Sequence, residues 1–291
     1  MKEWGRLLTA MVTPFDEDMN VNYDKAVVLA KKIVNDGTTA LVVSGTTGEA
    51  PTLTNEEKYE LFRILKQEVN VPIIAGIGTN CTRATIEMGK KAIESNSDGV
   101  LVVVPYYNKP NQKGLYEHFR AIAEAIDLPM MTYNVPARTG GNMDAETSIE
   151  LSKISNIVAL KEASGDIDQV TKILAGCSED FIVYSGDDGF TLPTLSAGGY
   201  GVVSVAAQVA GGLMRDMIDA FVAGELSKAA RAHQRLNPLL DVLFMTANPI
   251  PVKAALNIMG MDVGGLRLPL VTAEQEVEDA VRAELEVLGL I

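Results

Sequence analysis

The chain alternates short apolar runs with longer amphipathic stretches. Eight runs are continuously apolar rather than alternating with polar residues, which is typical of parallel strands that are covered on both faces. The predicted strands are Leu7–Thr13, Ala40–Ser44, Ile73–Gly76, Gly99–Val104, Met130–Asn134, Val158–Lys161, Ile182–Gly186 and Gly201–Val205.

The stretches between these runs have the spacing of amphipathic helices. In Tyr23–Asn35, one face is formed by Ala26, by Leu29 or Ala30, and by Ile33. Thr54 and Glu57 have the spacing of a capping box, in which a hydroxyl and a carboxylate satisfy the free backbone donors at the start of a helix.

Eight strands, each followed by a helix, predict an α/β protein of the (β/α)8 TIM-barrel class with a C-terminal helical appendage. We expect one domain, in which residues 1–210 supply the barrel strands and helices and residues 211–291 supply the closing helix and the appendage. An open doubly wound sheet is the alternative, but it usually has fewer strands. After Val205 the pattern predicts helices without intervening strands, over Leu213–Val222, Leu226–Phe244, Pro251–Met259 and Glu274–Leu288.

Composition and charge narrow the functional classes. The 291 residues are 47% apolar and 22% charged, as in a globular protein. Lys and Arg number 25 against 38 Asp and Glu, and the resulting net charge of −13 disfavours nucleic-acid binding. Two histidines, His118 and His233, are too few for a histidine-based metal site. Gly76-Ile77-Gly78 lacks the third glycine of a dinucleotide-binding motif and no Walker-type motif follows a glycine loop, so we expect neither a metal nor a cofactor.

The N-terminal region shows no targeting pattern. Lys2 and Arg6 precede the apolar run Leu7–Val12, which is too short for the apolar core of a signal peptide. No run approaches the length of a membrane span. Cys81 and Cys177 form no disulfide framework, and we expect both to be buried apolar residues. These features predict a cytoplasmic protein that does not bind membranes.

Unusual polar residues gather at the carboxyl ends of the predicted strands, where the active sites of such barrels lie. If the strand count is right, they surround one cavity. The segments are Gly45-Thr46-Thr47-Gly48-Glu49, Pro105-Tyr106-Tyr107-Asn108, Tyr133-Asn134-Val135-Pro136-Ala137-Arg138-Thr139-Gly140, Lys161-Glu162, Gly186-Asp187-Asp188 and Val203-Ser204.

Lys161 is the principal candidate nucleophile because it ends an apolar strand and its stem starts inside the barrel wall. An ordinary lysine is only about one part in 2,500 neutral at pH 7, and desolvation raises that fraction by lowering the pKa. The neutral amine can then condense with a carbonyl to form a Schiff base. The alternative is a lysine at the end of a strand whose ammonium extends to solvent.

Three further segments suit small anionic carbonyl substrates. Tyr133 can carry protons to and from a carbinolamine, although a packed ring with a satisfied hydroxyl is the alternative. Thr46 and Thr47, between glycines, offer hydroxyls and backbone amides to a carboxylate, or form a plain turn. Arg138 can bind a second carboxylate, or take part in a surface ion pair.

Other signals are weaker. Asp187-Asp188 has no histidine partner and is interpreted as a helix cap rather than a metal site. Lys253 falls within a helical pattern and is a poorer nucleophile candidate than Lys161.

These motifs in combination resemble the dihydrodipicolinate synthase family within the pyruvate-dependent class I aldolase superfamily, which also includes N-acetylneuraminate lyase. The resemblance runs from about Leu7 to Leu270. It rests on Gly45-Thr46-Thr47-Gly48-Glu49, Pro105-Tyr106-Tyr107-Asn108, Tyr133-Asn134-Val135-Pro136-Ala137-Arg138-Thr139, Val158-Ala159-Leu160-Lys161-Glu162 and Gly201-Val202-Val203-Ser204-Val205.

The resemblance implies a lyase that condenses pyruvate with L-aspartate 4-semialdehyde, on the route to diaminopimelate and lysine. Lys161 would form the Schiff base, and a relay of Tyr133, Thr46 and Tyr107 would move protons, with Tyr107 reaching the site of a neighbouring subunit in a homotetramer built from dimers. Thr47 would hold the pyruvate carboxylate and Arg138 that of the semialdehyde. The Val203 carbonyl and Gly186 would shape the pocket.

Two alternatives stay open, and one departure from the family pattern matters. The chain is either this synthase, an N-acetylneuraminate lyase or keto-sugar-acid aldolase, or a non-catalytic barrel that binds keto acids. Arg138 favours the synthase. Lysine-inhibited relatives carry a Ser-Ala pair and histidines where this chain has Ala50, Pro51, Asn55 and Lys58, so we predict weak or absent feedback by lysine.

Overall fold

Eight parallel strands close into a barrel in chain order, because β1 pairs with both β2 and β8. The computed structural model describes residues 4–291, so that Lys2 lies outside the described residues. All eight predicted strands are present, most of them shorter by one to three residues than predicted. They are β1 (Leu7–Ala10), β2 (Ala40–Val43), β3 (Ile73–Gly76), β4 (Gly99–Val103), β5 (Met130–Asn134), β6 (Ile157–Glu162), β7 (Ile182–Ser185) and β8 (Gly201–Ser204).

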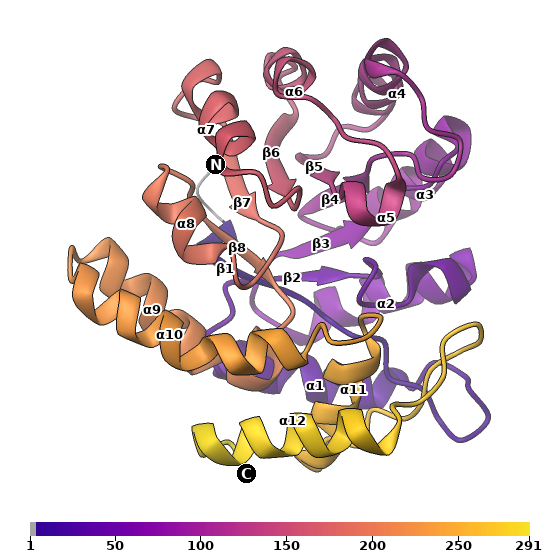
Figure 1. Cartoon of the computed structure of the whole chain (residues 1–291). Helices are drawn as coiled ribbons and strands as arrows, with labels where there is room; N and C mark the ends of the chain where they lie inside the picture. The colour runs from indigo at the N-terminus through magenta and orange to yellow at the C-terminus, as the bar shows by residue number, and fades with distance from the viewer. Residues whose placement is uncertain (1–3) are drawn as a thin grey trace.

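Helices surround the barrel and connect its strands (Figure 1). The capping box at Thr54 is present with both of its hydrogen bonds. The connecting elements are α1 (Tyr23–Asn35), the short 3-10 helix η2 (Ala50–Thr52), α2 (Asn55–Glu68), α3 (Thr82–Glu94), α4 (Gln112–Ala125), α5 (Pro136–Thr139), α6 (Ala145–Leu151), α7 (Ile167–Gly176) and α8 (Thr191–Ser196).

The C-terminal helices pack together on one side of the barrel (Figure 1). Helix α10 packs on α9 and α12, and α11 packs on α12 and α9. Their order without intervening strands agrees with the sequence pattern. They are α9 (Ala207–Val222), α10 (Leu226–Val242), α11 (Ile250–Ile258) and α12 (Gln275–Leu288).

Strand β6 carries one residue more than its partner β5, and this irregularity sets the register of the site. Met130 is paired with Ile157, whereas Met131 is paired with Ala159, so Val158 is skipped. Val158 and Ala159 both belong to the core inside the barrel, whereas Ile157 and Leu160 belong to the core between strands and helices. The extra residue places Lys161 opposite Tyr133 on the inner face.

Both cysteines differ from the expectation. Cys81 is exposed and Cys177 is half-buried, and neither forms a disulfide. The prediction of two buried cysteines is therefore wrong, because Cys81 immediately precedes α3 in a surface loop and Cys177 immediately follows the end of α7.

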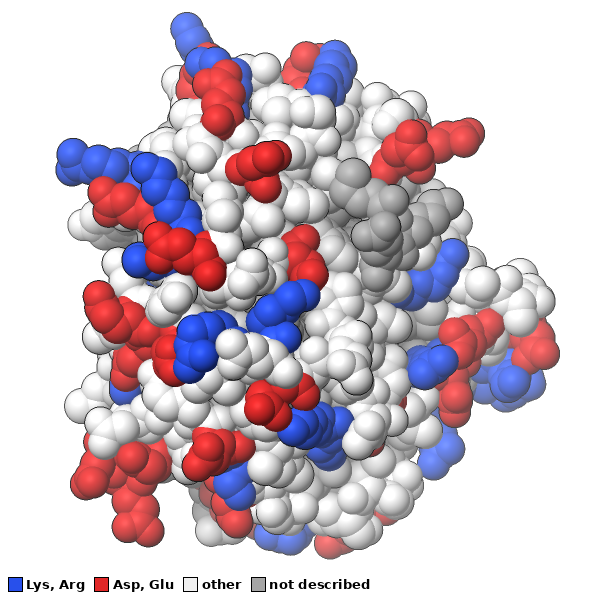
Figure 2. Space-filling model, turned by 180° about the vertical axis from the view of Figure 1, so that it is seen from behind, with Lys and Arg blue, Asp and Glu red and all other residues white. Residues whose placement is uncertain are grey.

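Charged side chains of both signs lie on the surface of the molecule. Acidic and basic side chains are intermixed over the face shown in Figure 2. Among residues 4–291, no helix combines the length and the apolar character needed to cross a bilayer.

Candidate active site

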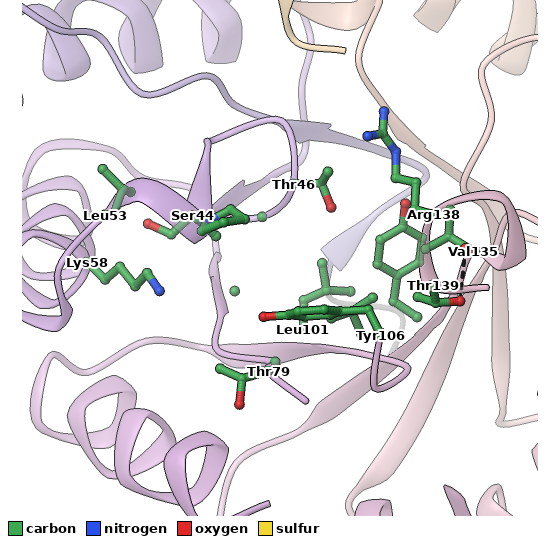
Figure 3. Close-up of a pocket in the computed structure, with 17 residues that line it drawn as sticks. Ser44, Thr46, Leu53, Lys58, Thr79, Leu101, Tyr106, Val135, Arg138 and Thr139 are labelled. Atoms are coloured by element: carbon green, nitrogen blue, oxygen red, sulfur yellow. Dashed lines mark hydrogen bonds between the residues drawn. The ribbon is translucent and has the colours of Figure 1, made fainter. Parts of the chain in front are cut away.

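A cavity of about 390 Å³ opens at the carboxyl ends of the strands. The structure brings six of the eight predicted site residues to its wall: Thr46, Thr47, Tyr133, Arg138, Lys161 and Gly186. A second cavity of about 410 Å³ adjoins it (Figure 3). Thr46, Tyr133 and Arg138 line both cavities.

The amine of Lys161 is buried inside the barrel. Lys161 is 5% exposed, and its Nζ lies 4.4 Å from the centre of the Tyr133 ring. Burial lowers the pKa of Lys161 to about 8, with Arg138 acting in the same direction and Asp188 and Asp187 opposing it. At that pKa about a tenth of the amine is neutral at pH 7, enough for nucleophilic attack on a carbonyl.

The phenol of Tyr133 is also buried, and it keeps its proton at neutral pH. Burial raises the pKa of Tyr133 to about 12, against the lowering effects of Arg138 and of a hydrogen bond with Thr46. A protonated phenol beside a partly neutral amine is suited to protonating an oxygen that leaves as water.

Thr47 is oriented by a residue from the far end of the chain. Asn248 Nδ2 donates a hydrogen bond of 2.9 Å to Thr47 Oγ1, and both residues are buried. Since the hydroxyl oxygen already accepts this bond, its proton is free to point to a carboxylate in the cavity. Asn248 lines the same cavity and was missed in the sequence, where the only signal is an Asn-Pro step before a helix.

Gly186 makes room for the lysine. A Cβ atom at this position would lie 3.0 Å from Cγ and 3.1 Å from Cε of Lys161, and 2.7 Å from Cβ of Ala163. Any larger residue would therefore displace the lysine stem, which explains why glycine is required beside the buried amine.

Arg138 is exposed on the short helix α5, with its side chain at the cavity wall. A guanidinium in this place can bind a substrate carboxylate at the mouth of the site.

Two predicted site residues do not line the main cavity of the single chain. Tyr107 is 88% exposed, has a positive φ of 75° and lines neither cavity. Val203 is buried in β8, and Val205 lines the cavity in its place. The roles implied for Tyr107 and Val203 remain predictions.

The Asp187-Asp188 pair does not cap the helix that follows it. The N-cap position of α8 is Phe190. Asp188 instead accepts hydrogen bonds from the backbone amides of Val205 and Ala206, at 2.9 and 3.0 Å, beyond the end of β8. The pair is therefore not a cap of α8. The buried Asp188 carboxylate instead binds the two amides between β8 and α9, the second of which belongs to Ala206, the N-cap residue of α9. Within residues 4–291 no group of three or more His, Cys, Asp or Glu has the arrangement of a metal site.

The second cavity contains most of the positions that bear on lysine feedback. Ala50, Pro51 and Lys58 line it, whereas Asn55 does not. Figure 3 shows the Lys58 side chain extending into this cavity, and burial lowers its pKa.

Known proteins share both the sequence and the fold. The model of the dihydrodipicolinate synthetase family matches residues 3–288. The 4-hydroxy-tetrahydrodipicolinate synthase of Moorella thermoacetica is 53% identical over 99% of this chain and 100% of its own length.

Two solved structures are similar throughout. The DHDPS from Cyanidioschyzon merolae with lysine bound is 50% identical, with a TM-score of 0.98 over 99% of each chain. A structure described as the first monomeric dihydrodipicolinate synthase variant is 41% identical, with a TM-score of 0.96 over 98% of this chain and 97% of its own. By its residues, its cavity and these similarities, the chain belongs to the dihydrodipicolinate synthetase family.

Proposed function

We propose that the chain is a Schiff-base lyase that condenses pyruvate with L-aspartate 4-semialdehyde, as a 4-hydroxy-tetrahydrodipicolinate synthase. The observation that carries the proposal is the buried amine of Lys161 beside the protonated phenol of Tyr133. The names of relatives that are 49–53% identical support it.

The first half of the reaction needs a neutral amine and a proton donor. The Lys161 amine attacks the ketone carbon of pyruvate, and the oxygen of the carbinolamine leaves as water after Tyr133 donates a proton. The resulting iminium is an electron sink, so the pyruvate methyl group can lose a proton, which returns to the Tyr133 phenolate, and the iminium becomes an enamine.

The second half forms the carbon–carbon bond. The enamine attacks the aldehyde carbon of the semialdehyde, and the aldehyde oxygen takes up a proton through the relay of Thr46 and Tyr133. The amine of the semialdehyde then attacks the iminium carbon, which closes the ring and releases Lys161 as a free amine. No electrons are gained or lost overall, and one water leaves for each condensation.

Two groups fit the two carboxylates. The free proton of the Thr47 hydroxyl points to the carboxylate of pyruvate, and the Arg138 guanidinium binds that of the semialdehyde. In a chain with a net charge of −13, such local donors are needed to hold anionic substrates.

Tyr107 requires a second copy of the chain if it takes part. Its side chain is exposed and lies outside the cavity of its own chain. We propose that it completes the relay in a neighbouring subunit of a homotetramer, in a cytoplasmic enzyme. A stable monomer with full activity would contradict this role of Tyr107.

Reductive trapping tests the proposal directly. Pyruvate with sodium cyanoborohydride should add the mass of the reduced adduct to Lys161, found by peptide mapping. Lys253 is a matched internal control, since burial lowers its pKa to about 8 as well, but it lies outside the cavity. Absence of label at Lys161 would refute the synthase and the lyase alike. Turnover of aspartate semialdehyde, with none of N-acetylneuraminate, separates the two.

A further inference from the structure

A buried ion pair joins the loop of the two threonines to the C-terminal helices. Glu49 Oε1 lies 2.6 Å from Lys253 Nζ, and both side chains are only 1% exposed. Glu49 follows Thr46 and Thr47 in the loop after β2, and Lys253 lies in α11. The mechanism proposed above uses neither residue.

Each charge of the pair has further partners. Lys253 Nζ donates to the carbonyl oxygen of Gly265 at 2.7 Å and lies 4.1 Å from the centre of the Phe15 ring. Glu49 Oε2 accepts from the backbone amide of Arg267 at 3.0 Å. These contacts offset part of the cost of removing two charges from water.

Arg267 extends the contact to the start of α2. Its guanidinium forms two hydrogen bonds with Glu57, of 2.8 and 2.6 Å, and a third with the carbonyl oxygen of Thr52. Three residues are therefore held by Arg267, which lies in the segment after α11. They are Glu49 just before η2, Thr52 at the end of η2, and Glu57 in α2.

The loop itself is a compact turn that ends at Glu49. The Glu49 amide donates to the carbonyl oxygen of Thr46 at 3.1 Å, and Glu49 has a left-handed φ of 56°. This conformation is unfavourable for a residue other than glycine, so contacts outside the loop must hold it. The ion pair with Lys253 is such a contact.

The loop is contacted twice, by helix α11 and by Asn248, which lies two residues before the start of that helix. Asn248 donates to the Thr47 hydroxyl, and Lys253 pairs with Glu49 two residues further along the loop. We propose that Glu49 and Lys253 are positioning residues that fix the Thr47 hydroxyl and its Asn248 partner in the geometry that binds the pyruvate carboxylate. This inference rests on the proposed function of the site.

If the pair served only to stabilise the fold, its replacement would leave the binding of pyruvate unchanged. Replacing a buried ion pair by uncharged side chains of similar size is often neutral or stabilising for the fold. Loss of the pair should therefore leave the fold intact and weaken the binding of pyruvate.

The double variant Glu49→Gln/Lys253→Met tests this, because it leaves no unpaired buried charge. The readout is the pyruvate concentration that half-saturates cyanoborohydride labelling of Lys161, which needs no second substrate. We expect it to rise about tenfold, which corresponds to one hydrogen bond to a charged group. The KM for aspartate semialdehyde should stay within about twofold, because its carboxylate binds Arg138.

The control is Lys66→Met/Asp98→Asn, which replaces two side chains that are both 32% exposed. It removes another ion pair, of 2.6 Å, between α2 and the residue before β4, at the opposite end of the strands. Half-saturation should not change in this variant. An unchanged value in a folded Glu49→Gln/Lys253→Met protein, or an equal change in the control, would overturn the proposal.

The variant Lys253→Arg decides the question if the double variant does not fold. It keeps the charge but changes the distance to Glu49, so we expect a smaller rise in half-saturation. A folded Lys253→Arg protein with the half-saturation of the original chain would overturn the proposal. Wild-type protein that labels with pyruvate but never consumes the semialdehyde would instead refute the proposed function.

Discussion

Lys161 and Tyr133 face one another across neighbouring strands because β6 contains one residue more than β5. Without the skipped residue Val158, the register at Met130 would place Tyr133 opposite Leu160. Adjacent residues of a strand point to opposite faces, so this shift decides whether the amine and the phenol share the inner face of the barrel.

The rate of Schiff-base formation should depend on pH through the amine. Because burial lowers the pKa of Lys161 to about 8, the neutral fraction rises about tenfold per pH unit below 8 and then levels off. The kcat/KM for pyruvate, measured between pH 6 and 9, should follow this fraction. A flat profile across this range would contradict it.

Replacing Lys161 should remove activity and stabilise the fold. The pKa of Lys161 falls from its ordinary value of 10.5 to about 8, so the unfolded chain binds more protons between these values. The stability of the original protein should therefore rise with pH from 8 to 10.5. The Lys161→Met variant does not have to bury an ammonium. Below pH 8 its free energy of unfolding should therefore be higher by about 3 kcal/mol. Denaturant unfolding at pH 7 and pH 10 measures both effects.

Tyr133→Phe should lower kcat by about a hundredfold or more, because the phenol is the proton donor. Tyr184→Phe is a matched control, since Tyr184 is the partner of Lys161 on its other side, in β7. Its hydroxyl donates to the carbonyl oxygen of Gly5, so its loss should cost about 1 kcal/mol of stability and leave kcat within about twofold. Equal losses of kcat in the two variants would refute the assignment of Tyr133.

Gly186→Ala should lower activity about a hundredfold by moving the lysine stem, which a Cβ atom would approach to 3.0 Å. Gly212→Ala in α9 is the control, because nothing lies within 4 Å of its Cβ position. That change should leave activity intact and slightly stabilise the helix. Labelling of Lys161 by pyruvate and cyanoborohydride reports the difference, and equal labelling of the two variants would contradict it.

Lysine should inhibit this enzyme weakly or not at all. The ammonium of Lys58 extends into a cavity also lined by Ala50 and Pro51, where it would repel a second cation. A relative that is 50% identical has been solved with lysine bound, so lysine inhibition of the two proteins can be measured side by side. A micromolar inhibition constant for lysine would disprove the prediction, and Lys58→Gln should increase any residual inhibition.

The sequence predicted the barrel and most of the site because both depend on local patterns. Continuous apolar runs marked all eight strands, and parallel strands bring residues such as Thr46 and Lys161 to one end of the barrel. Six of the eight predicted site residues therefore line one cavity, whereas Tyr107 and Val203 do not.

Features that depend on contacts between distant segments could not be predicted. Asn248 contacts Thr47 across 201 positions of sequence, and no local pattern signals this hydrogen bond. The skipped residue Val158 looks like any other apolar residue of a strand. The partners of Asp188 could not be predicted for the same reason, since Val205 and Ala206 lie between β8 and α9.

The position of Asn248 and Lys253 near the carboxyl end of the chain has a consequence for biosynthesis. A nascent polypeptide emerges from the ribosome amino end first, so the Thr46–Thr47 turn is made long before the residues that contact it. Barrel strands can pair during translation, but the full affinity for a keto acid must wait for α11 and the residues just before it. A translation product that ended before Asn248 would then bind pyruvate more weakly, even if its strands had paired.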